Sequence, residues 1–135
     1  IFLIEQLTGS KPNVGGLVLV PTRELAIQVN SEIRRLAKYT KFNSLAIYGG
    51  QPILGQIQSL RHGPNVIVAT PGRLLDHMDR RTVDLSSIEV VILDEADQML
   101  DMGFHDTLDA IVECIPNQRQ TYVSYRSAPQ DHRFH

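Results

Sequence analysis

Three carboxylates lie close together directly behind a short apolar run. Residues 90–97 read VVILDEAD, in which Asp94, Glu95 and Asp97 are the acidic residues. Like charges at this spacing repel one another, so each carboxylate would resist ionisation if it were buried without a partner. A carboxylate at the end of a buried strand can hold Mg²⁺ through water beside nucleotide phosphates, and its neighbour can activate the attacking water. We therefore assign Asp94 to the metal, Glu95 to the water and Asp97 to a contact with another loop.

A simpler interpretation of these carboxylates is also available. Acidic residues favour the first turn of a helix, because they interact well with the helix dipole, and a helical pattern follows. This preference accounts for one carboxylate or two. It does not account for three that directly follow an apolar strand.

Two other segments, VLVPTREL and IVATPGRL, repeat one pattern at residues 18–25 and 67–74. Each is an apolar strand, then a threonine next to a proline, then an arginine at a helix start. The amino end of a helix presents unpaired amides and partial positive charge, which suit an anion. The threonines can cap these helices and donate hydroxyl hydrogen bonds, and the arginines add permanent charge: Thr22, Thr70, Arg23 and Arg73.

Glycines extend this pattern of sites for phosphate. Gly49 and Gly50 follow another apolar run, and Gly72 lies within the second segment, where it would allow a close approach of a ligand backbone. Either segment alone is explained as an ordinary helix cap with a solvated arginine. Together they indicate a single-stranded nucleic acid held by its backbone, without reading of bases. Aromatic residues are only 6% of the chain, so base stacking is limited, with Tyr48 the one plausible partner.

The elements that must position these residues alternate along the chain. Apolar β-rich runs predict strands over 16–20, 44–48, 65–70, 88–94 and 120–125. Periodic patterns predict helices over 23–39, 53–60 and 71–79, and over 99–115, where Gly103 could interrupt the helix. Such alternation is typical of an α/β domain with a parallel sheet flanked by helices on both faces. Ligands of such sheets gather at the carboxyl ends of the strands, where all four segments would meet.

Composition restricts the class of protein. The 135 residues carry a net charge of −2, with 42% hydrophobic and 21% charged residues, which suits one globular domain without a general electrostatic attraction for nucleic acid. Cys114 is the only cysteine, so no internal disulfide can form, and its apolar helical neighbours predict a buried, inert thiol. No apolar run approaches the ~20 residues that span a membrane. The chain begins IFLIEQL, without methionine and in mid-pattern, so we interpret its start as a cut edge.

VPTRELA, the Gly-Gly pair, ATPGRL and VILDEADQMLDMGF, in this order, resemble the motifs of the DEAD-box RNA helicases over residues 1–121. The resemblance implies the first RecA-like domain of an ATP-dependent RNA helicase, a P-loop NTPase fold. It implies ATP and Mg²⁺ as cofactors, RNA and a second RecA-like domain as partners, and a cytoplasmic location, or a nuclear one in a eukaryote. It also implies contact with the RNA backbone for Pro21, Thr22, Arg23, Gly49, Gly50, Thr70, Pro71, Gly72 and Arg73.

Two features depart from the pattern of that family. LTGSK, at residues 7–11, follows a helix and is followed by Pro12, so it does not resemble a phosphate-binding loop. Residues 1–135 are therefore expected to be one N-terminally truncated RecA-like domain 1, which lacks the first strand and the phosphate loop and is not an ATPase by itself. The family's Ser-Ala-Thr triplet aligns with Tyr125, Arg126 and Ser127, or begins at Ser127. The resemblance assigns Asp97 and Ser127 to coupling between domains.

Two further hypotheses stay open. The chain could be a non-enzymatic module that binds RNA or a partner protein and has lost the nucleotide site. In addition, the strand that the family places within the sheet is expected to be missing, which would leave an unpaired strand edge. Exposed edges pair readily with other chains, so this edge predicts self-association.

Overall fold

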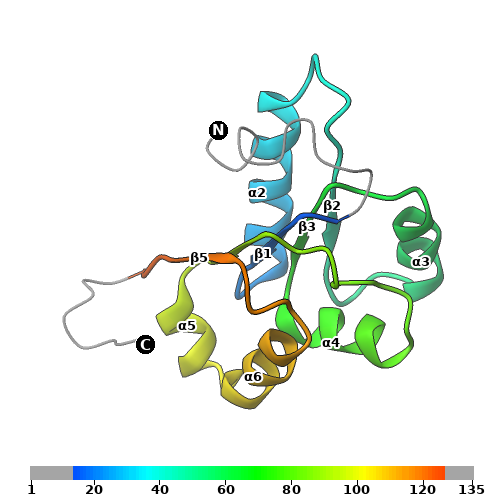
Figure 1. Ribbon diagram of the computed structural model, residues 1–135. Helices are drawn as coiled ribbons and strands as arrows, with labels where there is room; N and C mark the ends of the chain where they lie inside the picture. The colour runs from blue at the N-terminus through cyan, green and yellow to red at the C-terminus, as the bar shows by residue number, and fades with distance from the viewer. Residues whose placement is uncertain (1–13, 127–135) are drawn as a thin grey trace.

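The computed structural model describes residues 14–126, and within them it contains one five-stranded sheet (Figure 1). The strand order is β2-β3-β1-β4-β5, and all four pairings are parallel. The α/β fold with a parallel sheet is therefore confirmed. The helix expected before residues 7–11 and Ser127, which the resemblance assigns to coupling between domains, lie outside the described residues. The strands are β1 (Gly16–Leu19), β2 (Ser44–Ile47), β3 (Val66–Ala69), β4 (Val90–Leu93) and β5 (Gln120–Val123).

The carboxyl ends of the strands are in register. Leu19 is aligned with Ala69 on one side and with Leu93 on the other, and Ala69 is aligned in turn with Ile47. Leu93 is aligned with Val123. The segments that follow the strands therefore leave the sheet at one edge, as the sequence predicted.

Helices cover both faces of the sheet. One face packs against α2 (Arg23–Leu36) through a core that includes Val18, Ala26 and Val68. The other face packs against a larger core to which α4 and α6 contribute Leu74 and Ile111. The remaining helices are α3 (Ile53–Arg61), α4 (Pro71–Asp79), α5 (Ala96–Asp101) and α6 (His105–Glu113).

The predicted bounds differ from the observed ones mainly at helix ends. The helix expected over 23–39 ends at Leu36, whose side chain is 42% exposed rather than part of the apolar face. The helix expected from 99 to 115 begins earlier, at Ala96, and is interrupted at Gly103, which has a φ of +88°. That left-handed conformation suits glycine, so the interruption anticipated there is confirmed.

The two outer strands differ in how their edges are protected. The carbonyl of Ser44, in β2, accepts hydrogen bonds from Nε and Nη2 of Arg34 at 3.2 and 2.8 Å, so α2 covers part of that edge. In β5, Gln120, Thr121 and Tyr122 are exposed. The sheet therefore ends in a protected strand on one side and an exposed strand on the other.

Two remaining expectations concern the surface. No helix within residues 14–126 combines the length and apolar character needed to cross a bilayer. The expectation of a buried Cys114 is wrong, because this residue is the C-cap of α6 and its side chain is exposed where the helix ends.

Candidate functional site

The first carboxylate, Asp94, directly follows β4 and is connected to the end of β5. Its amide donates to the carbonyl of Leu19 at 2.9 Å, and its Oδ1 accepts a hydrogen bond from the hydroxyl of Ser124 at 2.5 Å. The same hydroxyl oxygen accepts from the amide of Glu95 at 3.2 Å. One serine therefore contacts both residues that the sequence assigned to metal and water. The sequence interpretation missed Ser124, because it aligned the family's Ser-Ala-Thr triplet with the next three residues, 125–127.

Glu95 turns the chain sharply between β4 and α5. Its φ of +54° and ψ of +51° place it in the left-handed region, which is uncommon for a residue with a Cβ atom. Such a conformation costs about 1–3 kcal/mol and persists where surrounding contacts hold it. Here the Ser124 hydroxyl holds the Glu95 amide, while the Glu95 carbonyl accepts from the amides of Gln98 and Met99. The backbone of the second carboxylate is therefore fixed at a strained turn.

Asp97 contacts the segment after β5. Its side chain is 4% exposed, and Oδ1 accepts a hydrogen bond from the amide of Arg126 at 2.8 Å. The Arg126 guanidinium donates to the side-chain oxygen of Gln98. These residues line a cleft of about 440 Å³ beside α5. The expected pairing of Asp97 with another loop is thus observed within this domain.

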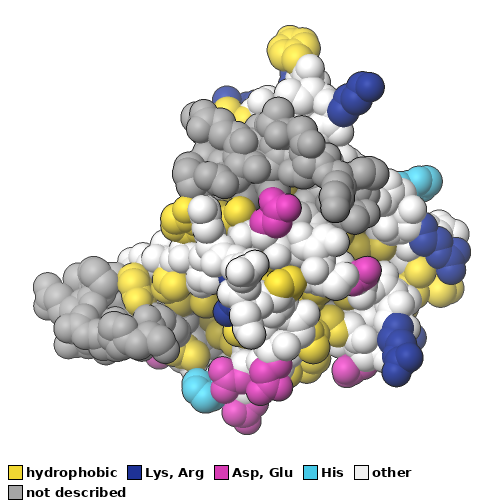
Figure 2. All heavy atoms as spheres, viewed as in Figure 1, with side chains coloured by type: hydrophobic (Ala, Val, Ile, Leu, Met, Phe, Trp, Pro, Cys, Tyr) yellow, Lys and Arg dark blue, Asp and Glu magenta, His cyan; other side chains and the backbone are white. Residues whose placement is uncertain are grey.

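The acidic residues do not form a preassembled set of metal ligands. Among the described residues, one group of three potential metal-binding side chains is close together: His105, Asp106 and Asp109, all exposed on α6. Figure 2 shows acidic side chains and a histidine together at the end of the molecule where α6 lies. Asp94 is half-buried, and a carboxylate oxygen is a ligand that Mg²⁺ accepts. Asp94 therefore fits the expected role of holding Mg²⁺ through water, with most ligands supplied by water and phosphate.

Arg23, at the start of α2, lies against the segment after β2. Thr22 is the N-cap of α2, and its hydroxyl oxygen accepts from the amide of Leu25 at 3.2 Å, so the predicted cap is confirmed. The Arg23 guanidinium carbon lies 5.5 Å from the centroid of the Tyr48 ring, within the range of a cation–π interaction. Gly50 has a φ of +82°, and a Cβ atom there would lie 3.3 Å from Nη1 of Arg23. The segments that follow β1 and β2 therefore meet.

Arg73, in the first turn of α4, connects the segments that follow β2 and β3. Its Nη1 donates to the carbonyl of Gln51 at 2.9 Å and to Oε1 of Gln56 at 3.1 Å. Thr70 is the N-cap of α4, but its side chain makes no capping hydrogen bond, unlike the prediction. Pro71 is buried at the first turn, whereas Gly72 is exposed, with nothing within 4 Å of a Cβ atom placed there. Arg73 is thus held, while the backbone beside it is accessible.

A buried polar cluster lies beneath these contacts. Gln56 is 8% exposed and His77 is 0% exposed. His77 Nε2 lies 2.8 Å from Oε1 of Gln56, and Nδ1 lies 2.7 Å from the hydroxyl of Thr82. Burial lowers the pKa of His77, and the charges of Arg73 and Arg80 lower it further, against the opposite influence of Asp76. Sequence interpretation missed Gln56 and His77, although both occupy positions on the buried faces of their helices.

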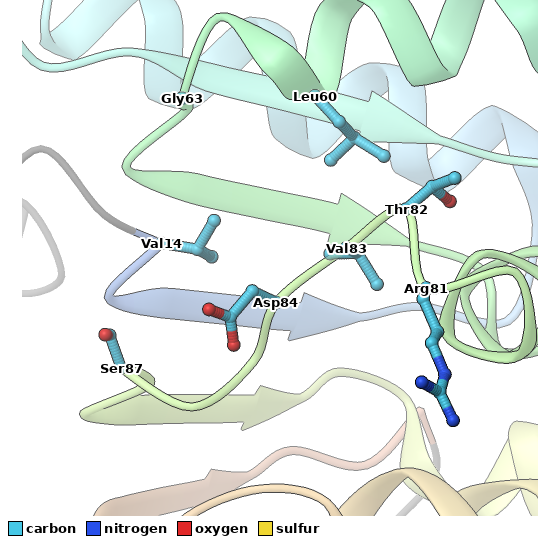
Figure 3. Close-up of a pocket in the computed structure, with 8 residues that line it drawn as sticks. All are labelled: Val14, Leu60, Gly63, Arg81, Thr82, Val83, Asp84 and Ser87. Carbon is cyan, nitrogen blue, oxygen red and sulfur yellow. The ribbon is translucent and has the colours of Figure 1, made fainter.

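Another hollow in the surface lies beside the sheet. Figure 3 shows it beside the amino ends of β1 and β3, with Val14, Leu60 and Val83 among the residues around it. Its volume is about 270 Å³. Because it lies away from the carboxyl ends of the strands, it is separate from the carboxylates and arginines of the candidate site. Thr82 lines it and also contacts His77, so the hollow borders the buried polar cluster.

The family model described as DEAD/DEAH box helicase matches residues 1–130. The DEAD-box ATP-dependent RNA helicase CshA of Bacillus subtilis (strain 168) is 45% identical over 127 residues, which cover 94% of this chain and 26% of that protein. The CshA helicase of Bacillus anthracis is 45% identical, with 94% and 24% covered. The ATP-dependent RNA helicase CshA of Listeria monocytogenes is 44% identical, with the same coverage. The chain spans about a quarter of the length of these relatives.

Proposed function

This chain belongs to the DEAD/DEAH box helicase family, and we propose that it is part of an ATP-dependent RNA helicase that couples ATP hydrolysis to RNA binding and duplex unwinding. In this proposal it forms most of the first RecA-like domain and acts with a second RecA-like domain of the complete protein. ATP and Mg²⁺ are its cofactors, and the cytoplasm is its location. The names of the bacterial relatives support the use of ATP and RNA.

One structural observation carries the proposal: the acidic and basic segments leave the sheet at the same edge. Leu19, Ala69 and Leu93 are aligned residue for residue, and the segments that begin at Pro21, Thr70 and Asp94 follow them directly. Positive charge and helix amino ends suit RNA phosphates, and the carboxylates suit a metal-bound nucleotide. A domain that holds both ligands at one edge can make the binding of one depend on the other.

The chemistry assigned to the carboxylates follows from their positions. Bound Mg²⁺ would neutralise phosphate charge as it develops, with Asp94 holding it through water. Glu95 would orient the attacking water and accept its proton. Ser124, by contacting the Asp94 carboxylate and the Glu95 amide, keeps these two groups in a fixed relative position. Asp97 and the segment after β5, which continues to Ser127, would transmit the nucleotide state to the second domain.

The RNA contacts in the proposal come from three segments. Arg23 and Arg73 supply charge, while Thr22, Thr70 and the exposed backbone of the glycine-containing turns supply hydrogen bonds to phosphates. Both arginines are held by neighbouring groups, which lowers the conformational entropy lost on binding. The remaining contacts in the proposal are Pro21, Gly49, Gly50, Pro71 and Gly72.

The decisive experiment is Glu95→Gln in the complete protein that contains this chain. We expect RNA-stimulated phosphate release to fall by at least about 100-fold, because loss of a general base typically costs 10²–10⁴. ATP binding, measured by a fluorescent ATP analogue, should persist. The exposed Glu89→Gln is the matched control. Unchanged phosphate release in Glu95→Gln would refute the catalytic assignment.

A second candidate function is a non-enzymatic module that binds RNA. It would use the same segments, in which Arg23 and Arg73 are held by neighbouring groups at the carboxyl ends of the strands. In both proposals the 135-residue chain by itself hydrolyses ATP negligibly, because Asp94 and Glu95 repel a triphosphate unless a lysine and a metal offset them. The candidates separate in the complete protein, since the module predicts RNA binding that is independent of ATP.

Self-association through β5 is the last part of the proposal. The strand β5 is the last strand of the described sheet, with Gln120 and Thr121 exposed, and such an edge strand can pair with a strand of a second copy. Light scattering of this chain over a range of concentrations tests it, with dimers expected at high concentration. Thr121→Lys should shift the equilibrium to monomer, whereas Gln58→Lys on the exposed side of α3 should not. A monomer at every concentration would contradict the pairing.

A further inference from the structure

Gln56 lies at the centre of the contacts that connect the RNA-facing segments. Its side-chain Nε2 donates to the carbonyl of Tyr48 at 2.8 Å. Its Oε1 lies 3.1 Å from Nη1 of Arg73 and 2.8 Å from Nε2 of His77. A neutral glutamine that is 8% exposed therefore contacts a strand end, an arginine and a buried histidine.

The partners of Gln56 determine which way its amide points. A carbonyl only accepts and a guanidinium only donates, so Nε2 faces Tyr48 and Oε1 faces Arg73. Since Oε1 can only accept, Nε2 of His77 must carry a proton and donate to it. In the neutral ring Nδ1 carries no hydrogen, so it accepts the single hydroxyl hydrogen of Thr82, 2.7 Å away, in competition with the His77 carbonyl, which lies 3.1 Å from the same hydroxyl. Each group in this chain of hydrogen bonds fixes the orientation of the next.

Arg73 is the charged group that these hydrogen bonds hold, and it is only partly exposed. Its side chain is 17% exposed. The two hydrogens of Nη1 are directed at Gln51 and Gln56, so the Nη2 side of the planar guanidinium remains to meet an anion. Nε lies 4.0 Å from the carboxylate of Asp76, which contributes only weakly at that distance. The orientation of the Nη2 side of the guanidinium is thus set by the contacts of Nη1 with Gln51 and Gln56.

We propose that Gln56 and His77 are positioning residues that hold Arg73 in the orientation in which it contacts an RNA phosphate. Neither residue reaches the RNA, and the inference rests on the proposed function, in which Arg73 binds RNA. The series of hydrogen bonds ends at Thr82, which lines the hollow beside β1 and β3 (Figure 3). The hydrogen bonds from Thr82 through His77 and Gln56 restrict the Arg73 side chain before RNA binds, so less conformational entropy is lost on binding.

The experiment is a double-mutant cycle on the 135-residue chain, with a fluorescein-labelled oligouridylate as the RNA probe. Arg73→Ala is expected to weaken binding about 10-fold and Gln56→Leu about 3-fold, since a hydrogen bond to a charged group is lost. In the Arg73→Ala background, Gln56→Leu should have no further effect. Gln58→Leu, an exposed glutamine of the same helix, is the matched control and should bind as the unaltered chain does.

The histidine is tested by paired substitutions. His77→Leu removes the donor and should weaken binding about as much as Gln56→Leu. His77→Gln retains an N–H donor at similar reach and should restore affinity. A purely structural role would instead lower the melting temperature and leave the affinity of the folded fraction unchanged, so both quantities are measured for every variant.

The outcomes separate this inference from the proposed function. If Arg73→Ala leaves RNA affinity unchanged, or the unaltered chain does not bind the probe, the RNA contact of Arg73 is refuted. If Arg73→Ala weakens binding but Gln56→Leu matches Gln58→Leu, the positioning role alone is overturned. A long-range ¹H–¹⁵N NMR spectrum tests the tautomer without RNA: a proton on Nε2 of neutral His77 supports the chain of hydrogen bonds, and a proton on Nδ1 overturns it.

Discussion

The hydroxyl of Ser124 lies 2.5 Å from Oδ1 of Asp94, although 30 positions separate the two residues in the sequence. This contact joins the ends of β4 and β5, which are neighbouring parallel strands. The same oxygen accepts from the amide of Glu95, whose backbone is in the left-handed region. Ser124 therefore connects the last strand to the two carboxylates assigned to ATP hydrolysis.

Ser124→Ala should lower ATP hydrolysis by the complete protein about 10-fold, because misplacement of a catalytic group by a fraction of an ångström is costly. The serine is exposed, so its hydrogen bonds should contribute at most about 1 kcal/mol to the free energy of unfolding. Phosphate release and urea unfolding measure the two effects. Ser124→Thr, which keeps the hydroxyl, should retain most activity. Equal activity of the alanine and threonine variants would show that the hydroxyl has no such role.

Arg23→Ala combined with Arg73→Ala should weaken RNA binding by this chain and reduce its dependence on salt. Loss of two phosphate contacts should lower the slope of log K against log salt by about 1 to 2. Binding titrations at several salt concentrations measure the slope. Arg35→Ala is the control, since Arg35 lies on the exposed side of α2 in an ion pair with Glu32. An unchanged slope in the double variant would exclude the proposed contacts.

Gly50→Ala should destabilise the chain by about 1–2 kcal/mol, because alanine is strained at the φ of +82° found there. The added methyl group would also displace Arg23, whose Nη1 would lie 3.3 Å away, so RNA affinity should fall as well. Gly49→Ala is the matched control, with no atom within 4 Å of its Cβ position, and should change stability by less than about 0.5 kcal/mol. Urea unfolding distinguishes the two, and equal effects would contradict this account.

The stability of the chain should decrease as the pH is lowered through the region below 6.5, the ordinary pKa of histidine. The pKa of His77 is lowered in the folded state, mainly by burial, so below 6.5 the unfolded chain binds more protons than the folded chain. The contribution is complete above 6.5 and is lost progressively until the folded pKa is reached. Urea unfolding at about pH 7.5 and about pH 5.5 measures it. His77→Gln should remove part of this dependence, and an unchanged profile would contradict the assignment.

Particular elements show what could be predicted. The strand–helix alternation follows from local periodicity, so the sequence predicted every strand to within a few residues, and the sheet edge where the segments meet. The predicted ends of helices were less accurate, as at Leu36 and Cys114. Periodicity does not specify at which residue a helix ends and its side chains become exposed to solvent. Gln56 and His77 did leave a signal, since His77 lies three positions after Leu74 and Gln56 four positions before Leu60, and both of these apolar residues pack in the core.

The sequence by itself determined the types of the elements, the family and the chemistry of the acidic and basic segments. Those properties depend on residue types within short windows. Only the tertiary structure decided that Ser124 contacts Asp94, that Asp97 turns toward Arg126, and that Gln56 joins Tyr48 to Arg73. These partners lie on different strands and helices. Which of them meet depends on strand order, register and side-chain direction, and a local pattern of residues does not contain that information.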